Sequence, residues 1–400
     1  MKILYVALSM RGMDDIIDGG SDDRGLPSFV YPLKAFIKKG HEVKIILISS
    51  YRKPINIKVD WLKNEDILYN SNADITSGSY IKRSITKFKE SILLCREISL
   101  QLKNGKYDFV YCHGKAAIIG NIFANIYRIP CGYRIYGTID MYDMLKTKGV
   151  LYTILKYPSY FALFNLKKKF MLITDDGSHG EYVVRRLRLR NSYKIYYWKN
   201  GVDRVQIDSS GIDVSQKPYI FTAGRVCETK GQHKSIEVLK GLIKNGCNIN
   251  LLIAGPLVDL DYYKKLKKMI RDYNIKDYVQ FLGDLPREQM QAYAHESKAV
   301  LLFARSSNLS NVFIECGIIG SVIITYDEES LHEFICNKKN GFFVSDHMEA
   351  VEIIKSLLSE EEKYSFLSSG IKSIMTEKML TWNERCDKEV KLVQEYATRG

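Results

Sequence analysis

Long apolar runs, paired cysteines and low-complexity tracts are all missing from this sequence of 400 residues. No window of 18 residues is both apolar and free of charge, so no segment is expected to span a bilayer. The eight cysteines are scattered, without a C-x-x-C pair or clustered histidines, which argues against a disulfide scaffold and a structural zinc site. No basic stretch with an apolar stretch behind it opens the chain, so a signal peptide is not expected. We therefore expect a cytoplasmic protein with reduced thiols.

Positive charge is distributed unevenly between the two halves of the chain. The sequence has 59 Lys and Arg residues against 46 Asp and Glu, a formal net charge of +13. Residues 1–200 contain 33 basic and 18 acidic side chains, whereas residues 201–400 contain 26 and 28. The whole excess lies in the first half, which predicts that the halves meet different partners. Because no recognition helix, RNA-binding aromatic motif or zinc finger accompanies this charge, nucleic acid is not expected as a partner.

Short β-branched runs alternate with helical stretches along both halves. In the first half, the expected strands are Lys2–Leu8, Val43–Ile48, Phe109–Cys112, Gly132–Tyr136 and Phe170–Thr174. In the second half, they are Tyr219–Ala223, Ile249–Ala254, Val279–Phe281, Ala299–Phe303 and Val322–Thr325. Strands that alternate with helices form parallel sheets covered on both faces. The predicted fold class is therefore α/β, with two Rossmann-like, doubly wound domains that face each other across a ligand-binding cleft.

Two loops of the second half have the residue types that bind phosphate. Gly224-Arg225 follows a predicted strand, and Lys230-Gly231 precedes the next helix. Arginine offers a planar fork and lysine a point charge, and both suit a diphosphate. The other loop, residues 306–311, is rich in serine and asparagine and leads into an apolar helix start, whose free N–H groups bind anions. Each feature also has a simpler explanation, a solvated loop and a helix cap.

Short motifs over nearly the whole chain, taken in order, resemble the family 4 (group 1) retaining glycosyltransferases of the GT-B fold. In the first half they are Gly19-Gly20, Lys39-Gly40-His41-Glu42-Val43, Tyr107-Asp108-Phe109-Val110 with His113-Gly114, and Lys199-Asn200-Gly201-Val202-Asp203. In the second half they are Gly224-Arg225 with Lys230-Gly231, Ala254-Gly255-Pro256, Phe281-Leu282-Gly283, Asn311-Val312-Phe313-Ile314-Glu315 and Asn340-Gly341-Phe342. Any one motif is weak, but the ordered set is specific.

The resemblance implies an acceptor-binding domain over residues 1–200 and a nucleotide-sugar domain over residues 201–378. A C-terminal helix within residues 379–400 is expected to pack back toward the first domain. In this family, positions that match Arg225 and Lys230 grip the donor diphosphate and stabilise the leaving nucleotide. Glu315 matches the carboxylate that accepts hydrogen bonds from the ribose hydroxyls.

The remaining donor contacts implied by the resemblance involve mainly backbone groups. The helix start at Asn311 and Val312 corresponds to the phosphate cradle. The nucleobase contact corresponds to Gly283, Asp284 and Leu285. The first-domain loop that approaches the diphosphate corresponds to Gly19 and Gly20.

Two positions depart from the family pattern. Ser307 stands where the family usually has a second glutamate near the donor sugar, and Tyr136 stands where it often has a histidine near the reacting centre. Because a serine and a tyrosine replace a carboxylate and an imidazole, the pattern does not specify the donor sugar, and a catalytically degenerate subunit is an alternative. On the acceptor side, we expect Tyr136, His113 and Asp175, although Asp175 can equally cap a helix.

No metal site is expected, and a nucleoside-diphosphate sugar linked to uridine or guanosine is a substrate rather than a cofactor. Asp259-Leu260-Asp261 has the Asp-x-Asp form that binds metal in another glycosyltransferase fold, but its position before a helix favours capping.

The stretch Val150–Phe164 is apolar and aromatic, and Lys167-Lys168-Lys169 follow it. Such a stretch over Val150–Lys169 is typical of a peripheral contact with an anionic membrane, but an internal helix explains it equally well.

The sequence therefore predicts a retaining, metal-independent glycosyltransferase. It is expected to move a sugar from a nucleotide sugar to a glycan or lipid-linked glycan, in bacterial surface polysaccharide biosynthesis at the inner face of the plasma membrane. Besides the degenerate subunit, a nucleotide-sugar epimerase on the same fold stays open as an alternative.

Overall fold

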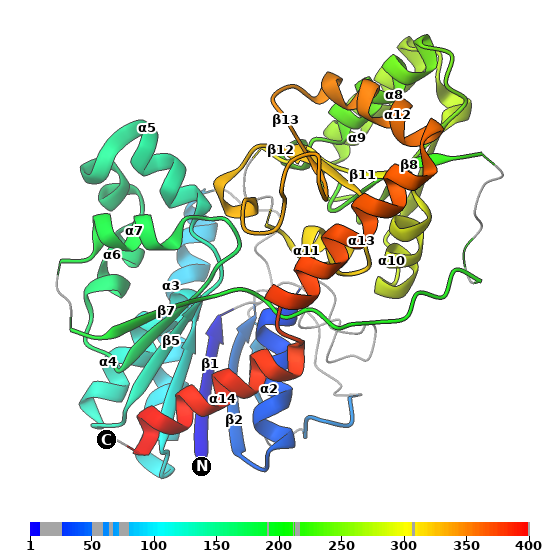
Figure 1. Ribbon diagram of the computed structural model, residues 1–400. Coiled ribbons are helices and arrows are strands. Elements are labelled where there is room, and N and C mark those ends of the chain that lie inside the picture. Colours follow the sequence, from blue (N-terminus) through cyan, green and yellow to red (C-terminus); the bar gives the residue numbers. More distant parts are fainter. Residues whose placement is uncertain are drawn as a thin grey trace. The chain divides into compact units, whose positions relative to one another are not determined.

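The computed structural model describes residues 1–8, 26–49, 59–63, 67–71, 80–189, 192–210, 212, 217–305 and 309–398 (Figure 1). The chain divides into two compact units. Unit 1 comprises residues 1–200 and 382–400, and unit 2 comprises residues 201–381. The last helix of the chain therefore belongs to the same unit as the first strand.

A parallel sheet of seven strands forms the centre of unit 1, in the order β3-β2-β1-β4-β5-β6-β7. The strands are β1 (Lys2–Leu8), β2 (Glu42–Ser49), β3 (Ile67–Ser71), β4 (Phe109–His113), β5 (Cys131–Ile135), β6 (Phe170–Thr174) and β7 (Lys194–Trp198). Strands β4, β5 and β6 are buried along their whole length. Continuous burial is expected of central strands in a parallel sheet that helices cover on both faces.

Helices cover both faces of this sheet. They are α2 (Pro27–Lys38), α3 (Tyr80–Asn104), α4 (Ala117–Ile126), α5 (Ile139–Lys156), α6 (Pro158–Asn165), α7 (Gly180–Leu187) and α14 (Trp382–Thr398), with the short 3-10 turn η2 (Gly114–Ala116). Helices α2 and α14 share a core with Ile3 and Tyr5 of β1. Helices α3 to α7 share the opposite core with Leu4 and Val6. This alternation follows from the two-residue period of a strand.

A parallel sheet of six strands forms the centre of unit 2, in the order β10-β9-β8-β11-β12-β13. The strands are β8 (Tyr219–Ala223), β9 (Asn250–Ala254), β10 (Val279–Gly283), β11 (Ala299–Leu302), β12 (Ile323–Tyr326) and β13 (Phe342–Val344). Its helices are α8 (Gln232–Lys244), α9 (Leu260–Asp272), α10 (Arg287–Glu296), α11 (Asn311–Ile318), α12 (Ala350–Ser359) and α13 (Glu361–Lys378), with 3-10 turns η3 (Glu228–Lys230), η4 (Lys276–Tyr278), η5 (Glu329–Leu331) and η6 (His347–Glu349). Helices α8, α9 and α12 line one core, and α10, α11 and α13 line the other.

The α/β prediction with two doubly wound sheets is confirmed. In each sheet, the chain reverses the direction in which strands are added at one point, between β1 and β4 in unit 1 and between β8 and β11 in unit 2. Ligands of open parallel sheets bind outside the carboxyl ends of the strands at such switch points. These two edges are where functional side chains are expected.

The apolar stretch after residue 149 is buried in one part and exposed in another. It is not one helix: the second part of α5 follows a kink at Gly149, and α6 begins at Pro158. Leu163 of α6 is fully buried, whereas Leu151 and Leu155 of α5 are 74% and 72% exposed. In the described part of the chain, no helix combines the length and apolarity needed to cross a membrane.

Candidate active site

Three neighbouring strands of unit 2 end in glycines with positive φ. Strand β8 is followed by Gly224, β9 is followed by Gly255, and β10 ends at Gly283. The Gly255 N–H donates to the Gly283 carbonyl at 2.6 Å. A Cβ atom on Gly255 would lie 2.0 Å from the Gly224 carbonyl oxygen, so no larger residue fits there. The carboxyl edge of the sheet is therefore closely packed backbone, which suits the close approach of a flat or anionic ligand.

The loop after β8 positions the two predicted catalytic cations. The Arg225 side chain is exposed, and the aliphatic stem of half-buried Lys230 lies 3.8 Å from where a Cβ of Gly224 would be. The amide Nε2 of buried Gln232 donates to the Arg225 carbonyl at 3.1 Å, which fixes the loop from beneath. Both cations thus belong to a restrained loop at the switch point of the sheet.

The same loop is joined to the end of β11. Gly231 has a φ of +77°, and a Cβ there would lie 2.2 Å from the Phe303 carbonyl oxygen. The Arg305 N–H donates to the Thr229 carbonyl at 3.0 Å, and Lys234 Nζ donates to the Phe303 carbonyl at 3.3 Å. Burial and then the nearby Arg305 charge lower the pKa of Lys234. No sequence motif marks Lys234 or Arg305, because the strand order β8-β11 alone brings the end of β11, with Phe303 and Arg305, beside this loop.

Helix α11 begins at the end of the loop that follows β11. Its N-cap is Ser310, whose Oγ accepts the Phe313 N–H at 3.3 Å. Asn311 and Val312 form the first turn and are half-buried. A helix cap, the simpler explanation offered for this loop, is thus present at Ser310, and the helix start lies at the same sheet edge as the Lys230 loop because β11 is the neighbour of β8.

Glu315 of α11 forms an ion pair with Arg287 of α10, with 3.1 Å between Oε1 and Nε. Arg287 also lies 3.4 Å from a carboxylate oxygen of Asp203. Burial raises the pKa of Glu315 to about 7, and the Asp203 and Glu288 charges add to this against the opposing effect of Arg287. A carboxylate in an apolar setting requires a partner. For Glu315 this partner is Arg287, which no motif in the sequence marks.

The segment after β10 leads directly to that arginine. Gly283 and Asp284 are exposed, Leu285 packs against the core beneath α10 and α11, and Arg287 is the first residue of α10. One strand end thus presents bare backbone at the sheet edge and also orients the guanidinium that holds Glu315.

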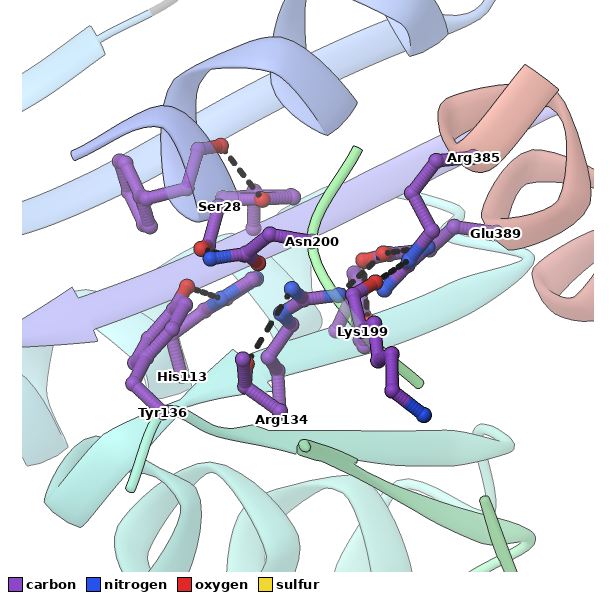
Figure 2. A network of polar contacts seen from close by, with 12 residues as sticks. Ser28, His113, Arg134, Tyr136, Lys199, Asn200, Arg385 and Glu389 are labelled. Carbon is purple, nitrogen blue, oxygen red and sulfur yellow. Dashed lines mark hydrogen bonds and ion pairs between the residues drawn. The ribbon is translucent and has the colours of Figure 1, made fainter. Parts of the chain in front are cut away.

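In unit 1, the three predicted acceptor-side residues follow three neighbouring strands. His113 ends β4, Tyr136 follows β5, and Asp175 follows β6. His113 Nδ1 and Tyr136 Oη are 2.6 Å apart, and Figure 2 shows the two side chains pointing toward one another. Asp175 instead pairs with Lys199 at 3.1 Å. The structure brings His113 and Tyr136 into contact, whereas Asp175 pairs with a lysine that directly follows β7.

The His113 ring is held by other rings. Its centroid lies 4.1 Å from that of Tyr5, 4.6 Å from that of Tyr111 and 5.1 Å from that of Phe29. Burial, and then the Arg134 charge, lower the pKa of His113 well below its usual range. The imidazole is therefore neutral at pH 7, and its buried Nε2 has no hydrogen-bond partner among the described residues.

A buried charge cluster lies under these residues (Figure 2). Glu389 of α14 accepts from Arg134 of β5, from Arg385 at 2.9 Å and from the Tyr111 hydroxyl at 2.6 Å. All three charged side chains are almost completely buried. The Arg134 guanidinium carbon lies 5.4 Å from the centre of the Tyr136 ring. Two cations against one carboxylate give this interior a positive charge beside the His113–Tyr136 pair.

The other predicted residues fall outside the site or outside the described residues. Asp259 caps α9 by accepting the Tyr262 N–H at 3.0 Å, as predicted, and exposed Asp261 pairs with Lys264. No group of three or more His, Cys, Asp or Glu residues that could hold a metal occurs in the described ranges. Gly19, Gly20 and Ser307 lie outside them.

Unit 2 therefore has positive groups, bare backbone, a helix start and a carboxylate at one sheet edge. Cations and N–H groups bind phosphate, and a carboxylate accepts hydrogen bonds from a diol. This combination fits a ligand in which a diphosphate adjoins a ribose.

Comparison with known proteins agrees with this chemistry. Residues 205–372 match a family model described as "Glycosyl transferases group 1". The capsular polysaccharide biosynthesis glycosyltransferase CapM of Staphylococcus aureus is 23% identical over 302 residues, which cover 70% of this chain and 75% of that protein.

Two solved structures share the fold over essentially the whole chain. Anabaena HepE, in complex with UDP and glucose, has a TM-score of 0.67 at 15% identity and covers 98% of this chain and 99% of its own. Sucrose-phosphate synthase of Thermosynechococcus elongatus has a TM-score of 0.75 at 12% identity and covers 100% of both chains. At such identities, the likeness establishes the fold alone.

Proposed function

We propose that the chain is a group 1 glycosyltransferase and that it transfers a sugar from a nucleoside-diphosphate sugar to a glycan with retention of the anomeric configuration; the family match of residues 205–372 and the GT-B fold support this. One observation supports this most strongly. The restrained Arg225–Lys230 loop and the Ser310-capped helix that contains Glu315 follow neighbouring strands, within the residues that match the family model.

In the proposed reaction, Arg225 and Lys230 bind the donor diphosphate and stabilise the negative charge that develops on the departing nucleotide. Such electrostatic stabilisation acts on the transition state more than on the ground state. The N–H groups of Asn311 and Val312 bind phosphate oxygens, and Glu315 accepts the ribose hydroxyls. The protein itself then supplies the positive charge that neutralises the diphosphate. We therefore expect transfer to continue when EDTA removes divalent metal ions.

The names of similar proteins indicate which donor and acceptor to test first. Uridine is the base to test first, since HepE was solved with UDP, and GDP-linked sugars are the second choice. The name of CapM supports a capsular or related surface polysaccharide as the acceptor. On the acceptor side, the neutral His113 and the Tyr136 hydroxyl offer hydrogen bonds to a sugar.

A lipid-linked acceptor at the cytoplasmic membrane face fits the exposed part of α5. Leu151 and Leu155 lie one helical turn apart, with exposed Lys156 directly after Leu155. Leucines with flanking lysines bind anionic lipid interfaces. Flotation with anionic vesicles at low salt should recover the protein, and L151S/L155S should stay unbound. Equal recovery of this variant, or no recovery of the wild type, would contradict the membrane contact.

The central test is Lys230→Ala, with Lys244→Ala at an exposed position of α8 as the matched control. Loss of Lys230 should lower kcat about 100- to 1,000-fold, the usual effect of removing one donor to a developing charge. The control should keep wild-type turnover. Products are identified by NMR of the new anomeric proton.

Several results would contradict the proposal. Normal turnover by Lys230→Ala would show that the loop is not the diphosphate site. Conversion of free nucleotide sugar without a new glycosidic bond would indicate an epimerase, and tight nucleotide binding without any turnover over a broad donor panel would indicate a degenerate subunit.

A further inference from the structure

A cluster of aromatic and basic side chains lies on α5 and α7, beside the carboxyl edge of the unit 1 sheet. The rings of Tyr142 and His179 are stacked, with centroids 4.0 Å apart and planes at 21°. The rings of Tyr142 and Tyr182 meet edge to face at 5.4 Å. All three side chains are half-buried, so part of each ring stays accessible. The accessible parts of such aromatic side chains offer apolar surface on which the C–H groups of a saccharide pack.

Two exposed cations flank these rings. Lys146 Nζ lies 4.9 Å from the Tyr182 centroid and 5.6 Å from that of Tyr142, and the Arg186 guanidinium carbon lies 5.5 Å from the Tyr182 centroid. Within the described ranges, neither cation forms an ion pair, whereas the neighbouring Arg185 pairs with Glu181 at 2.8 Å. Both lie over the Tyr182 ring, so the two charges are at most about 10 Å apart, which is about the Debye length at 0.1 M ionic strength, and an anion bound beside this ring is attracted by both.

The backbone under the cluster is strained and fixed. His179 adopts a left-handed conformation, with φ of 53° and ψ of 42°, directly before α7. A non-glycine residue keeps such a conformation only where its surroundings impose it, and these positions are enriched at ligand sites. The Thr138 N–H donates to Ser178 Oγ at 3.0 Å, and the Thr138 hydroxyl donates to the Ser178 carbonyl at 2.7 Å.

These bonds connect the cluster to the predicted acceptor residues. Thr138 follows Tyr136 by two residues and directly precedes α5, and Ser178 follows Asp175 by three. The loops after β5 and β6 are therefore one structural unit, with Tyr136 and Asp175 at the strand ends and the aromatic rings farther along the same loops.

We propose that Tyr142, His179, Tyr182, Lys146 and Arg186 form an acceptor subsite for a negatively charged saccharide. The sugar ring packs on the aromatic side chains, and its phosphate or carboxylate binds between the lysine and the arginine, which suit such anions as point charge and planar fork. This inference rests on the proposed assignment of the acceptor to unit 1. The shared chemistry is an anion attached to a sugar or to its lipid carrier.

The test measures binding to the full-length protein with UDP at saturation, so that the donor site is already occupied. Three probes are titrated calorimetrically: methyl glucoside, methyl glucuronoside and farnesyl diphosphate below its aggregation concentration. The neutral glucoside should bind at least about tenfold more weakly than an anionic probe, because it lacks the charge-assisted bonds. Preference for the glucuronoside identifies an acidic sugar as the source, and preference for the diphosphate identifies the carrier lipid.

The variant K146Q/R186Q should lose about tenfold or more in affinity for the preferred anionic probe. The matched control K148Q/R185Q removes two positive charges from the same two helices and should bind like the wild type. Equal losses in both variants would overturn the subsite, since general surface charge would then explain binding. Failure of all three probes to bind the wild type would also overturn it.

Failure of the acceptor subsite is distinguishable from failure of the proposed function. UDP binding and its sensitivity to Lys230→Ala report on unit 2 alone. Normal UDP binding together with no preference for an anionic probe rejects the subsite and leaves the glycosyltransferase proposal intact.

Discussion

Glu315 is the residue whose protonation is expected to control donor binding. Its pKa is raised to about 7 by burial, and only the carboxylate accepts two ribose hydroxyls. Because the apparent dissociation constant scales inversely with the competent fraction, affinity for UDP-glucose should rise about tenfold between pH 6 and pH 8. UDP-glucose is chosen because its diphosphate does not titrate in this range. Calorimetric titration at several pH values measures the effect.

The control for this prediction is Glu315→Gln, which should bind UDP-glucose more weakly and with a flat pH profile. A wild-type profile without the rise would contradict the assigned role of Glu315. The free protein should show the opposite trend in stability. A carboxyl whose pKa is raised on folding contributes stability that is present below its unfolded pKa and lost as pH rises through about 7.

At the scale of single residues, the sequence shows which side chain needs a partner but does not show which residue that partner is. A carboxylate among Phe313, Ile314 and Cys316 must be compensated, and this was enough to single out Glu315. Arg287 lies 28 positions earlier, and only the packing of α10 beside α11 brings them together. His113 and Tyr136 are likewise joined by the pairing of β4 with β5.

At the scale of elements, α14 is expected to be essential to the stability of unit 1. Glu389 is the carboxylate partner of both Arg134 and Arg385 in the interior. Removing one partner of a buried ion pair usually costs about 3–5 kcal/mol, because the remaining charge has no compensation. Glu389→Gln should lower the free energy of unfolding of unit 1 by about this amount.

Urea denaturation followed by the tryptophan fluorescence of unit 1 can measure this loss. The matched control, Glu395→Gln, replaces an exposed glutamate of the same helix and should stay within about 0.5 kcal/mol of the wild type. A similar stability for both variants would contradict the importance of the buried cluster.

The sheet edge of unit 2 leads to a second prediction at this scale. Gly255→Ala would put a Cβ 2.0 Å from the Gly224 carbonyl oxygen, which is backbone and cannot rotate away. The loop with Arg225 and Lys230 must then shift, so UDP affinity should fall at least about tenfold, because donors misplaced by an ångström lose much of their effect. Gly246→Ala, where the added Cβ has no neighbour within 4 Å, is the control, since Gly246 also has a positive φ (78° against 132° at Gly255). Thermal-shift titration with UDP compares the two, and equal affinities would refute the close-packing argument.

Elements were predictable from the sequence where a clear period exists. Strands β1, β6 and β8 have the predicted ends, since each is a short apolar run between turn residues. Helix α3 was not predicted, because its many lysines and glutamates interrupt the apolar period. Strand β13 has three residues, too few for a two-residue alternation to show.

At the scale of the whole molecule, the uneven charge of the sequence predicts separate ligands for the two units. Hydrogen exchange with and without saturating UDP should show slower exchange in unit 2 at residues 224–231 and 311–318, because ligand binding stabilises only the form that binds it. The β4–β6 strands of unit 1 should keep their exchange rates. Slower exchange there, with none at the Lys230 loop, would place the nucleotide in the wrong unit for the proposed function.

The position of α14 in the sequence also sets an order of events during synthesis. Unit 2 is one continuous segment and is complete when residue 381 has been made. Arg134 is made 255 positions before its partner Glu389. At about 5–20 residues per second, the ribosome needs about 13 to 50 s to add the residues between them. The half of the protein that is made first is therefore finished last, and a chain stopped anywhere before α14 would expose an uncompensated arginine to the cell's quality control.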